Sequence, residues 1–289
     1  MPALSETSYG KSRIRLVRVT RHGSASSHGP SKGDRHTIRD FTVAIDFEGN
    51  YDTSYTDGDN ADVLPTDTMK NTVYALAARD GVGEAEVFGR ALGGHFIARN
   101  PKLDRVRVDV TDHGWDRIAI GDREHGSSFT RRGPEVRTAR VVTSRDGSEI
   151  TAGITDLLIM KTAKSAFAGF PRDEYTTLPD TTDRLFVTSL TATWTYAEHD
   201  IDFAVVFAAV RTTLLESFAQ HDSRSVQHTL YAMGQVVLDT IGAVGSIRLE
   251  MPNRHHLPID LSKLGLPNRN EVFVATEEPH GLIRATLSR

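Results

Sequence analysis

Apolar and polar side chains alternate with a period of two along several stretches of the chain, which predicts half-buried β-strands. The clearest stretch is 36–48, where every second residue from Phe41 to Phe47 is large and apolar. In the stretch 11–20 the alternation slips by one position between Leu16 and Val17, which indicates a β-bulge or a strand covered on both faces. Further strands are predicted at 105–111, 136–143, 150–161, 185–196, 246–251, 271–276 and 282–287.

Four other stretches carry apolar residues three or four positions apart, as expected of helices with one buried face. In the first half of the chain, one helix is predicted to begin near Pro65-Thr66-Asp67, with a hydroxyl or carboxylate as its cap, and another follows Gly83. In the second half, one helix follows Asp200 or Asp202 and the next is capped within 223–225. Between these elements, 23–34 is expected to be a flexible connection, and 49–60 and 121–133 are expected to be turns.

The order β-β-α-α-β-β thus occurs twice, and a tight turn at Asp146-Gly147 lies between the two halves. We therefore predict two domains, 1–145 and 146–289, of the α+β class, with antiparallel sheets and helices on one face. The other face of each sheet needs cover. Assembly of several copies around a central barrel supplies this cover, and a monomeric sandwich is the alternative.

Composition excludes several classes of protein. The 289 residues contain 34 basic and 38 acidic side chains, so a net charge of −4 disfavours nucleic acid or an anionic membrane as the main partner. The absence of cysteine excludes disulfides, thiolate catalysis and cysteine-ligated metals. No stretch is expected to be long and apolar enough to span a bilayer, and the N-terminus lacks a signal-peptide core. A cytoplasmic protein is predicted.

The segment 167–184 joins two predicted strands and is too long for a tight turn. Long loops on a rigid scaffold commonly bind something, and apolar residues from Phe167 to Leu178 are expected to give this one its own contacts. Phe167 offers an aromatic face, and Arg184 offers a planar donor at the mouth of the next strand. This pair suits a flat, oxygen-rich anion. The alternative is that Arg184 simply pairs with Asp180 or Asp183.

The remaining chemical motifs are weak one by one. The 12 histidines are scattered, and His255 and His256 are adjacent, so in a strand they point to opposite faces. No zinc, P-loop or dinucleotide motif is present. Polar residues do lie at the ends of elements, where two helix N-termini facing one pocket favour an anion. These residues are Lys11, Thr66, Asp67, Val226, Gln227, Asn253 and His255.

Taken in order, five segments resemble the motif set of urate oxidase (uricase) of the bacterial type. They are Tyr9-Gly-Lys11, Pro65-Thr-Asp-Thr-Met-Lys-Asn-Thr72, the stretch 167–178 with Asp183-Arg184, Ser225-Val-Gln227 and Pro252-Asn-Arg-His255. The resemblance covers nearly the whole chain. It implies a tandem pair of T-fold (tunnelling) domains, a homotetramer that encloses a tunnel, and active sites shared between adjacent subunits.

The resemblance also implies the chemistry, which is oxidation of urate by O2 and water to 5-hydroxyisourate and H2O2 in purine catabolism, without a metal or organic cofactor. Phe167 is then expected to stack on the purine, and Arg184 and Gln227 to hold its pyrimidine edge. The backbone N–H groups of Asp67 and Val226 bind further ring positions. Proton transfer is assigned by the resemblance to Lys11, Thr66 and His255, and the holding of O2 or water to Asn253.

Two other functions stay open from the sequence. One is a zinc-dependent pterin or cyclohydrolase-type enzyme on the same fold, which stoichiometric zinc would support. The other is a purine-binding oligomer without catalysis, against which the presence of Lys11 and Thr66 argues.

Overall fold

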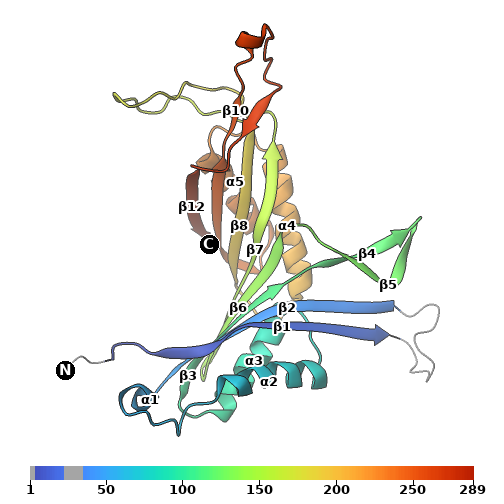
Figure 1. Ribbon diagram of the computed structural model, residues 1–289, viewed down its shortest axis with the longest axis vertical. Coiled ribbons are helices and arrows are strands. Elements are labelled where there is room, and N and C mark those ends of the chain that lie inside the picture. Colours follow the sequence, from blue (N-terminus) through green and yellow to red (C-terminus); the bar gives the residue numbers. More distant parts are fainter. Residues whose placement is uncertain (1–3, 23–34) are drawn as a thin grey trace. The chain divides into compact units, whose positions relative to one another are not determined.

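The computed structural model describes residues 4–22 and 35–289, so the predicted flexible connection 23–34 lies outside the described residues. The chain divides into two compact units, Met1–Ala152 and Gly153–Arg289, and the strand β7 (Gly147–Lys161) runs across the boundary. Each unit contains antiparallel strands and two long helices (Figure 1). The predicted α+β class and the doubled order of elements are confirmed.

The first unit is built on four antiparallel strands in the spatial order β1-β2-β3-β6. Its helices α2 and α3 come between the second and third strands of the sequence, and a separate hairpin, β4 with β5, comes between the third and fourth. The bounds are β1 Ser8–His22, β2 Arg35–Gly49, α1 Asp52–Thr56, α2 Thr66–Arg79, α3 Ala85–Arg99, β3 Leu103–Asp112, β4 Trp115–Ile120, β5 Arg123–Arg131 and β6 Val136–Ser144.

The core of the first unit lies between one face of this sheet and α2 and α3. The alternating residues from Phe41 to Phe47 are all buried there, as predicted from their spacing. Gly93 lets α3 approach the sheet, because a Cβ at this position would lie 2.3 Å from Thr143 Oγ1. A β-bulge is present in β1, but it lies between Lys11 and Ile14, where Arg13 has a φ of 57°. At the slip between Leu16 and Val17 the pairing with β2 is regular, so the position expected for a bulge is wrong. The bulge returns Ile14 and Leu16 to the core face.

The second unit repeats this plan with the strand order β7-β8-β9-β12 and with α4 and α5 between its second and third strands. A small hairpin, β10 with β11, again comes between the third and fourth strands. The bounds are β8 Phe186–Tyr196, α4 Phe203–Gln220, α5 Val226–Thr240, β9 Val244–Arg254, β10 His256–Pro258, η1 Ser262–Leu264, β11 Phe273–Ala275 and β12 Gly281–Ser288.

Helix α4 has the length and composition of a membrane span, so the expectation that no stretch is apolar enough is wrong on those two criteria. Its stripe nevertheless packs on β8, where Phe203 contacts Tyr196 and Phe218 contacts Phe186 edge to face. One helix of this kind is weak evidence for a membrane, because core helices of soluble proteins share the same composition. Asp202 caps it by accepting the N–H groups of the second and third helical residues, as one of the two predicted caps.

Three sequence expectations for local structure are wrong. The segment 49–60 contains the short helix α1, and 121–133 contains the whole of β5 instead of turns alone. The helix α2 has Pro65 as its N-cap and no side-chain cap, because Thr66 and Asp67 already lie inside its first turn. The strand β10 was not predicted, since three residues are too few for a period to show.

Candidate active site

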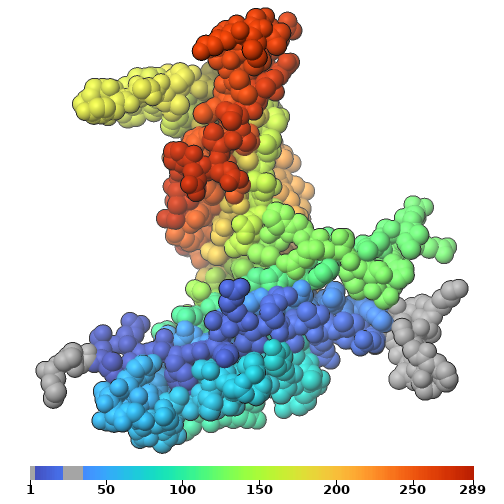
Figure 2. All heavy atoms as spheres, in the orientation of Figure 1, coloured from blue at the N-terminus to red at the C-terminus, as the bar shows by residue number. Residues whose placement is uncertain are grey.

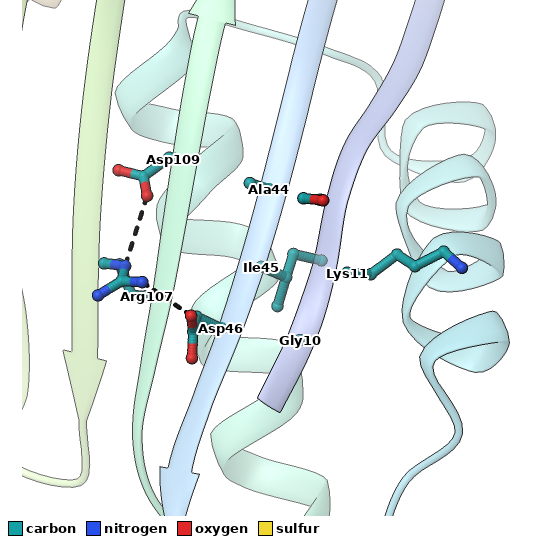
Figure 3. A pocket seen from close by; sticks show the side chains of 8 residues that line it. Gly10, Lys11, Ala44, Ile45, Asp46, Arg107 and Asp109 are labelled. Atoms are coloured by element: carbon teal, nitrogen blue, oxygen red, sulfur yellow. Dashed lines mark hydrogen bonds and ion pairs between the residues drawn. The ribbon is translucent and has the colours of Figure 1, made fainter. Parts of the chain in front are cut away.

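Lys11 lies on β1 in the first unit, directly before the bulge and opposite Ile45 of β2. Its side chain extends away from Asp46, Arg107 and Asp109, which form a ladder of ion pairs across the strands (Figure 3). Its charge instead reaches the start of α2, where it contributes to lowering the pKa of Asp67. The fold therefore directs the ammonium group of Lys11 toward the helix N-terminus that carries Thr66.

The first turn of α2 presents Thr66 and Asp67. The Asp67 carboxylate is exposed and binds Lys70 and Asn71, and these hydrogen bonds are the largest cause of its lowered pKa. The side chain of Asp67 is thus engaged with its own helix. Because Pro65 supplies no capping side chain, the backbone N–H groups of this turn are left for another acceptor.

In the second unit, Ser165 joins three segments that are distant in sequence. Its carbonyl accepts the N–H of Arg184 at 2.8 Å, and the next residue, Ala166, donates to the carbonyl of Ser223 at 2.7 Å. Phe167 is held by two further backbone bonds to Thr181, at 2.7 and 2.9 Å. These bonds fix Phe167, Arg184 and the beginning of α5 within one network.

Phe167 and Arg184 face each other in this network. The Cζ atom of Arg184 lies 5.3 Å from the centre of the Phe167 ring. Phe170 stacks on Phe167 with 4.8 Å between ring centres and 12° between planes, so this ring accepts a flat aromatic partner. The predicted combination of an aromatic plate and a planar cation is present.

The alternative in which Arg184 pairs with a neighbouring carboxylate is not what the structure shows. The Oδ1 atom of Asp180 lies 3.4 Å from Nη2 of Arg172 instead. Within the described part of the chain, Arg184 forms no ion pair with Asp180 or Asp183. The Nε atom of Arg184 is buried without a hydrogen-bond partner among the described residues. Burial lowers the pKa of this guanidinium from its ordinary value. Among the residues that the structure describes, this desolvated cation has no carboxylate partner in a recorded ion pair.

Helix α5 begins next to this cation. Ser225 caps it by accepting the N–H of His228 at 3.1 Å, as predicted. Val226 buries its side chain in the core, so its contribution to a ligand is limited to its backbone N–H. Gln227 follows on the exposed side, where its amide is accessible.

Asn253 and His255 lie at the end of β9 in the same unit. Asn253 is 9% exposed and pairs in register with Thr188 of β8. Burial, then the positive charges of Arg184 and His280, lower the pKa of His255 below its ordinary 6.5. The imidazole is therefore neutral near pH 7, as a proton acceptor requires. Because the charge of Arg184 contributes to lowering the pKa of His255, the two side chains lie in one region.

The end of the loop departs from expectation. Tyr175 is 82% exposed and Leu178 is 50% exposed, so they do not supply the apolar contacts predicted for them. The extension that carries them projects from the rest of the second unit (Figure 2). Ser165 and Ser223, which anchor the site through their backbones, were not found from the sequence. Backbone bonds of this kind leave no pattern in side-chain types.

Within residues 4–22 and 35–289, no group of three or more histidine, cysteine, aspartate or glutamate side chains converges as metal ligands do. Lys11, Thr66 and Asp67 belong to the first unit, and the six other candidate residues belong to the second.

These features define an α+β protein of two antiparallel units, of which one presents an arginine and a phenyl ring suited to a planar anion. A family model described as Uricase matches residues 7–142 and 150–284. The chain is 42% identical to the uricase of Arthrobacter globiformis, over 99% of this chain and 90% of that protein, and 38% identical to the uricase of Dictyostelium discoideum, over 100% and 98%.

Solved structures agree with the sequence relatives. A crystal structure of the Arthrobacter globiformis uricase matches with a TM-score of 0.92 at 41% identity, covering 100% of this chain and 96% of that one. A uricase structure from Bacillus fastidious matches with a TM-score of 0.82 at 25% identity, covering 99% and 94%. The chain belongs to the uricase family, and it is an oxidoreductase of the tandem T-fold type.

Proposed function

We propose that this protein oxidises urate with O2 and water to 5-hydroxyisourate and H2O2, as a step of purine breakdown in the cytoplasm. The observation that carries the proposal is the desolvated Arg184 guanidinium, which lies over the Phe167 ring and has no anionic partner among the described residues. A buried cation without a counter-charge is costly, and a flat anion that stacks on the ring and accepts from the guanidinium removes that cost. Urate has this shape and charge.

The binding roles are those that the resemblance implies, and the contact of Arg184 with the Phe167 ring supports them. The purine stacks on Phe167, and Arg184 and Gln227 donate to its pyrimidine edge. The backbone N–H of Val226, in the open first turn of α5, binds a further ring position. This clamp uses one charge-assisted contact and several directional ones, so it fixes the orientation of the purine as well as its affinity.

The electrons come from urate, an electron-rich purine, and O2 accepts two of them. The protein has to move protons. Lys11 and Thr66 take a proton from urate and pass it on, with His255 as the neutral acceptor that completes the relay. Asn253 holds O2 and then the water that adds to the ring. Water and O2 together supply the added hydroxyl and the peroxide, so atoms and electrons balance without an added reductant.

We further propose that the chain consists of two T-fold domains, 1–145 and 146–289, and acts as a homotetramer. Lys11, Thr66 and the backbone of Asp67 from one chain then complete the purine clamp of a neighbouring chain. This assembly also covers the polar sheet faces that the helices leave open.

The test is an oxygen-electrode trace of the purified protein with urate, with and without a chelator. We expect oxygen uptake, peroxide release and loss of the urate absorption band, all insensitive to the chelator. Loss of activity on chelation, together with stoichiometric zinc, supports the cyclohydrolase-type alternative instead. Tight binding of a xanthine analogue without oxygen uptake supports a non-catalytic purine binder.

A further inference from the structure

Tyr9 joins the strand that carries Lys11 to the segment that leads into α2. Its hydroxyl oxygen accepts the backbone N–H of Leu64 at 2.9 Å. Leu64 lies two residues before Thr66, and Tyr9 lies two residues before Lys11 on β1. The hydrogen bond therefore joins the two segments that carry Lys11 and Thr66, two residues before each of them in the sequence.

Lys11 and Tyr9 share one face of β1, because side chains two positions apart in a strand point the same way. They pair in register with Ile45 and Phe47 of β2, respectively. Gly10 between them lets β1 lie against β2, since a Cβ there would stand 1.9 Å from the Ile45 carbonyl oxygen. The backbone of β1 next to Lys11 therefore packs closely against β2.

The Tyr9 ring is itself held in place. It makes edge-to-face contacts with Phe47, at 5.6 Å between ring centres, and with Tyr51, at 5.1 Å. Phe47 and Tyr51 are both almost fully buried. Burial also raises the pKa of the Tyr9 hydroxyl above its ordinary 10, so the group stays neutral over the working range of an enzyme. The fixed ring and the neutral hydroxyl therefore hold the backbone of Leu64 in a constant position relative to β1.

Val63 and Leu64, in the segment that Tyr9 holds, also pack against the core of the first unit. Pro65, the N-cap, has no N–H and offers no side-chain bond to the first turn of α2. The Leu64 N–H, one residue before this N-cap, is instead bonded to Tyr9, which ties the approach to the helix to β1. Helix α2 is therefore positioned at its beginning by β1, on the side where Lys11 stands.

We propose that Tyr9 is a positioning residue that sets the geometry of the Lys11–Thr66 pair, a role that rests on the proton transfer proposed above. Removal of its hydroxyl leaves the Leu64 N–H without an acceptor and lets the start of α2 move relative to Lys11. A displacement of about 1 Å at a reacting pair can reduce turnover by up to about a hundredfold.

The test compares Tyr9→Phe with Tyr74→Phe. Tyr74 lies further along α2, and its hydroxyl donates to the carbonyl of Arg15 on the same strand at 3.2 Å. Both variants thus lose one hydroxyl bond between β1 and the α2 region and keep the ring, but only Tyr9 is close to the pair. We expect Tyr9→Phe to lower kcat about ten- to a hundredfold with KM within roughly twofold, and Tyr74→Phe to leave both unchanged.

Amide hydrogen exchange adds a readout that does not depend on activity. In the wild-type protein the Leu64 amide should be protected, and in Tyr9→Phe, but not in Tyr74→Phe, residues 64–69 should exchange faster. A Leu64 amide that exchanges freely in the wild-type protein overturns the inference, as does a kcat for Tyr9→Phe within twofold of wild type. Equal loss of kcat in both variants shows a general effect on stability and also overturns it. A wild-type protein that consumes no oxygen with urate contradicts the proposed function itself.

Discussion

Replacing Arg184 by glutamine removes the cation that the proposed urate clamp depends on. In the free protein, Arg184 pairs with neither Asp180 nor Asp183, so the change breaks no ion pair with either of them. The loss there is the contact with the Phe167 ring, worth about 2 kcal/mol for a desolvated cation. Removing a desolvated charge offsets part of it. The free energy of unfolding should therefore change by less than about 2 kcal/mol.

Binding should respond much more strongly. Removing one partner of a buried, charge-assisted contact costs about 2–5 kcal/mol, because the other charge is then buried without compensation. At about 1.4 kcal/mol per tenfold, this corresponds to a Kd about 30- to 4,000-fold higher for an inert xanthine analogue. Isothermal titration calorimetry measures the affinity, and thermal unfolding of the same samples measures the stability.

Arg172→Gln is the matched control. The Cζ atom of Arg172 lies 4.9 Å from the centre of the Phe170 ring in the same loop, but its side chain is half exposed and already pairs with Asp180. An exposed pair of this kind contributes about 0–1 kcal/mol, so the Kd of the analogue should stay within about threefold. If Arg184→Gln binds the analogue as tightly as the wild-type protein, or if both variants lose the same affinity, the clamp is not where we place it.

Other changes separate proton transfer from binding and from folding. Lys11→Met should lower kcat by at least about a hundredfold while the analogue Kd stays within about threefold, and wild-type turnover in this variant would remove Lys11 from the relay. The lowered pKa of His255 means that its neutral form persists below pH 6.5, so the acid limb of the kcat/KM profile should have its midpoint below this value and should disappear in His255→Asn. A midpoint of this acid limb above pH 6.5 contradicts the assignment. The lowered pKa also means that the unfolded chain binds the proton of His255 more readily than the folded chain. The contribution of His255 to stability is therefore present above pH 6.5 and is lost as the pH falls through its lowered pKa. Asp202→Ala should cost about 1 kcal/mol of unfolding free energy, measured with urea, without changing kcat, because Asp202 caps α4 away from the candidate residues; unchanged stability would show that the cap contributes nothing.

The elements with one buried face could be predicted from the sequence because burial imposes a period. The run from Phe41 to Phe47 is buried as expected, and so are the stripes of α4 and α5 except for Phe207 and Ile241, which are half-buried. The slip between Leu16 and Val17 did not locate the bulge, which lies between Lys11 and Ile14; Val17 simply faces solvent.

The hairpin of β4 and β5 was missed because it has no buried face. Most of its side chains are exposed, so no alternation marks it. The available signal was the Gly121-Asp122 pair between two short runs, which is typical of a two-residue hairpin turn. The cap of α2 was misjudged for a different reason. Thr66 and Asp67 have side chains suited to capping, but Pro65 takes the cap position and moves both into the helix.

The candidate residues were found through their order along the chain, and the structure adds how they are held. Ser165 joins Arg184 to the segment before α5 through backbone atoms alone, which the choice of side chains does not reveal. The hydroxyl bond from Tyr9 to Leu64 depends on a tertiary contact across 55 positions and is equally invisible in the sequence.

A crystal structure of the protein with a bound xanthine analogue tests the central claim most directly. The account predicts that the analogue stacks on Phe167, accepts from Arg184 and Gln227, and binds the N–H of Val226, while Lys11 and Thr66 of an adjoining chain approach its opposite edge. An analogue bound elsewhere, with the guanidinium of Arg184 still unpaired, would contradict it.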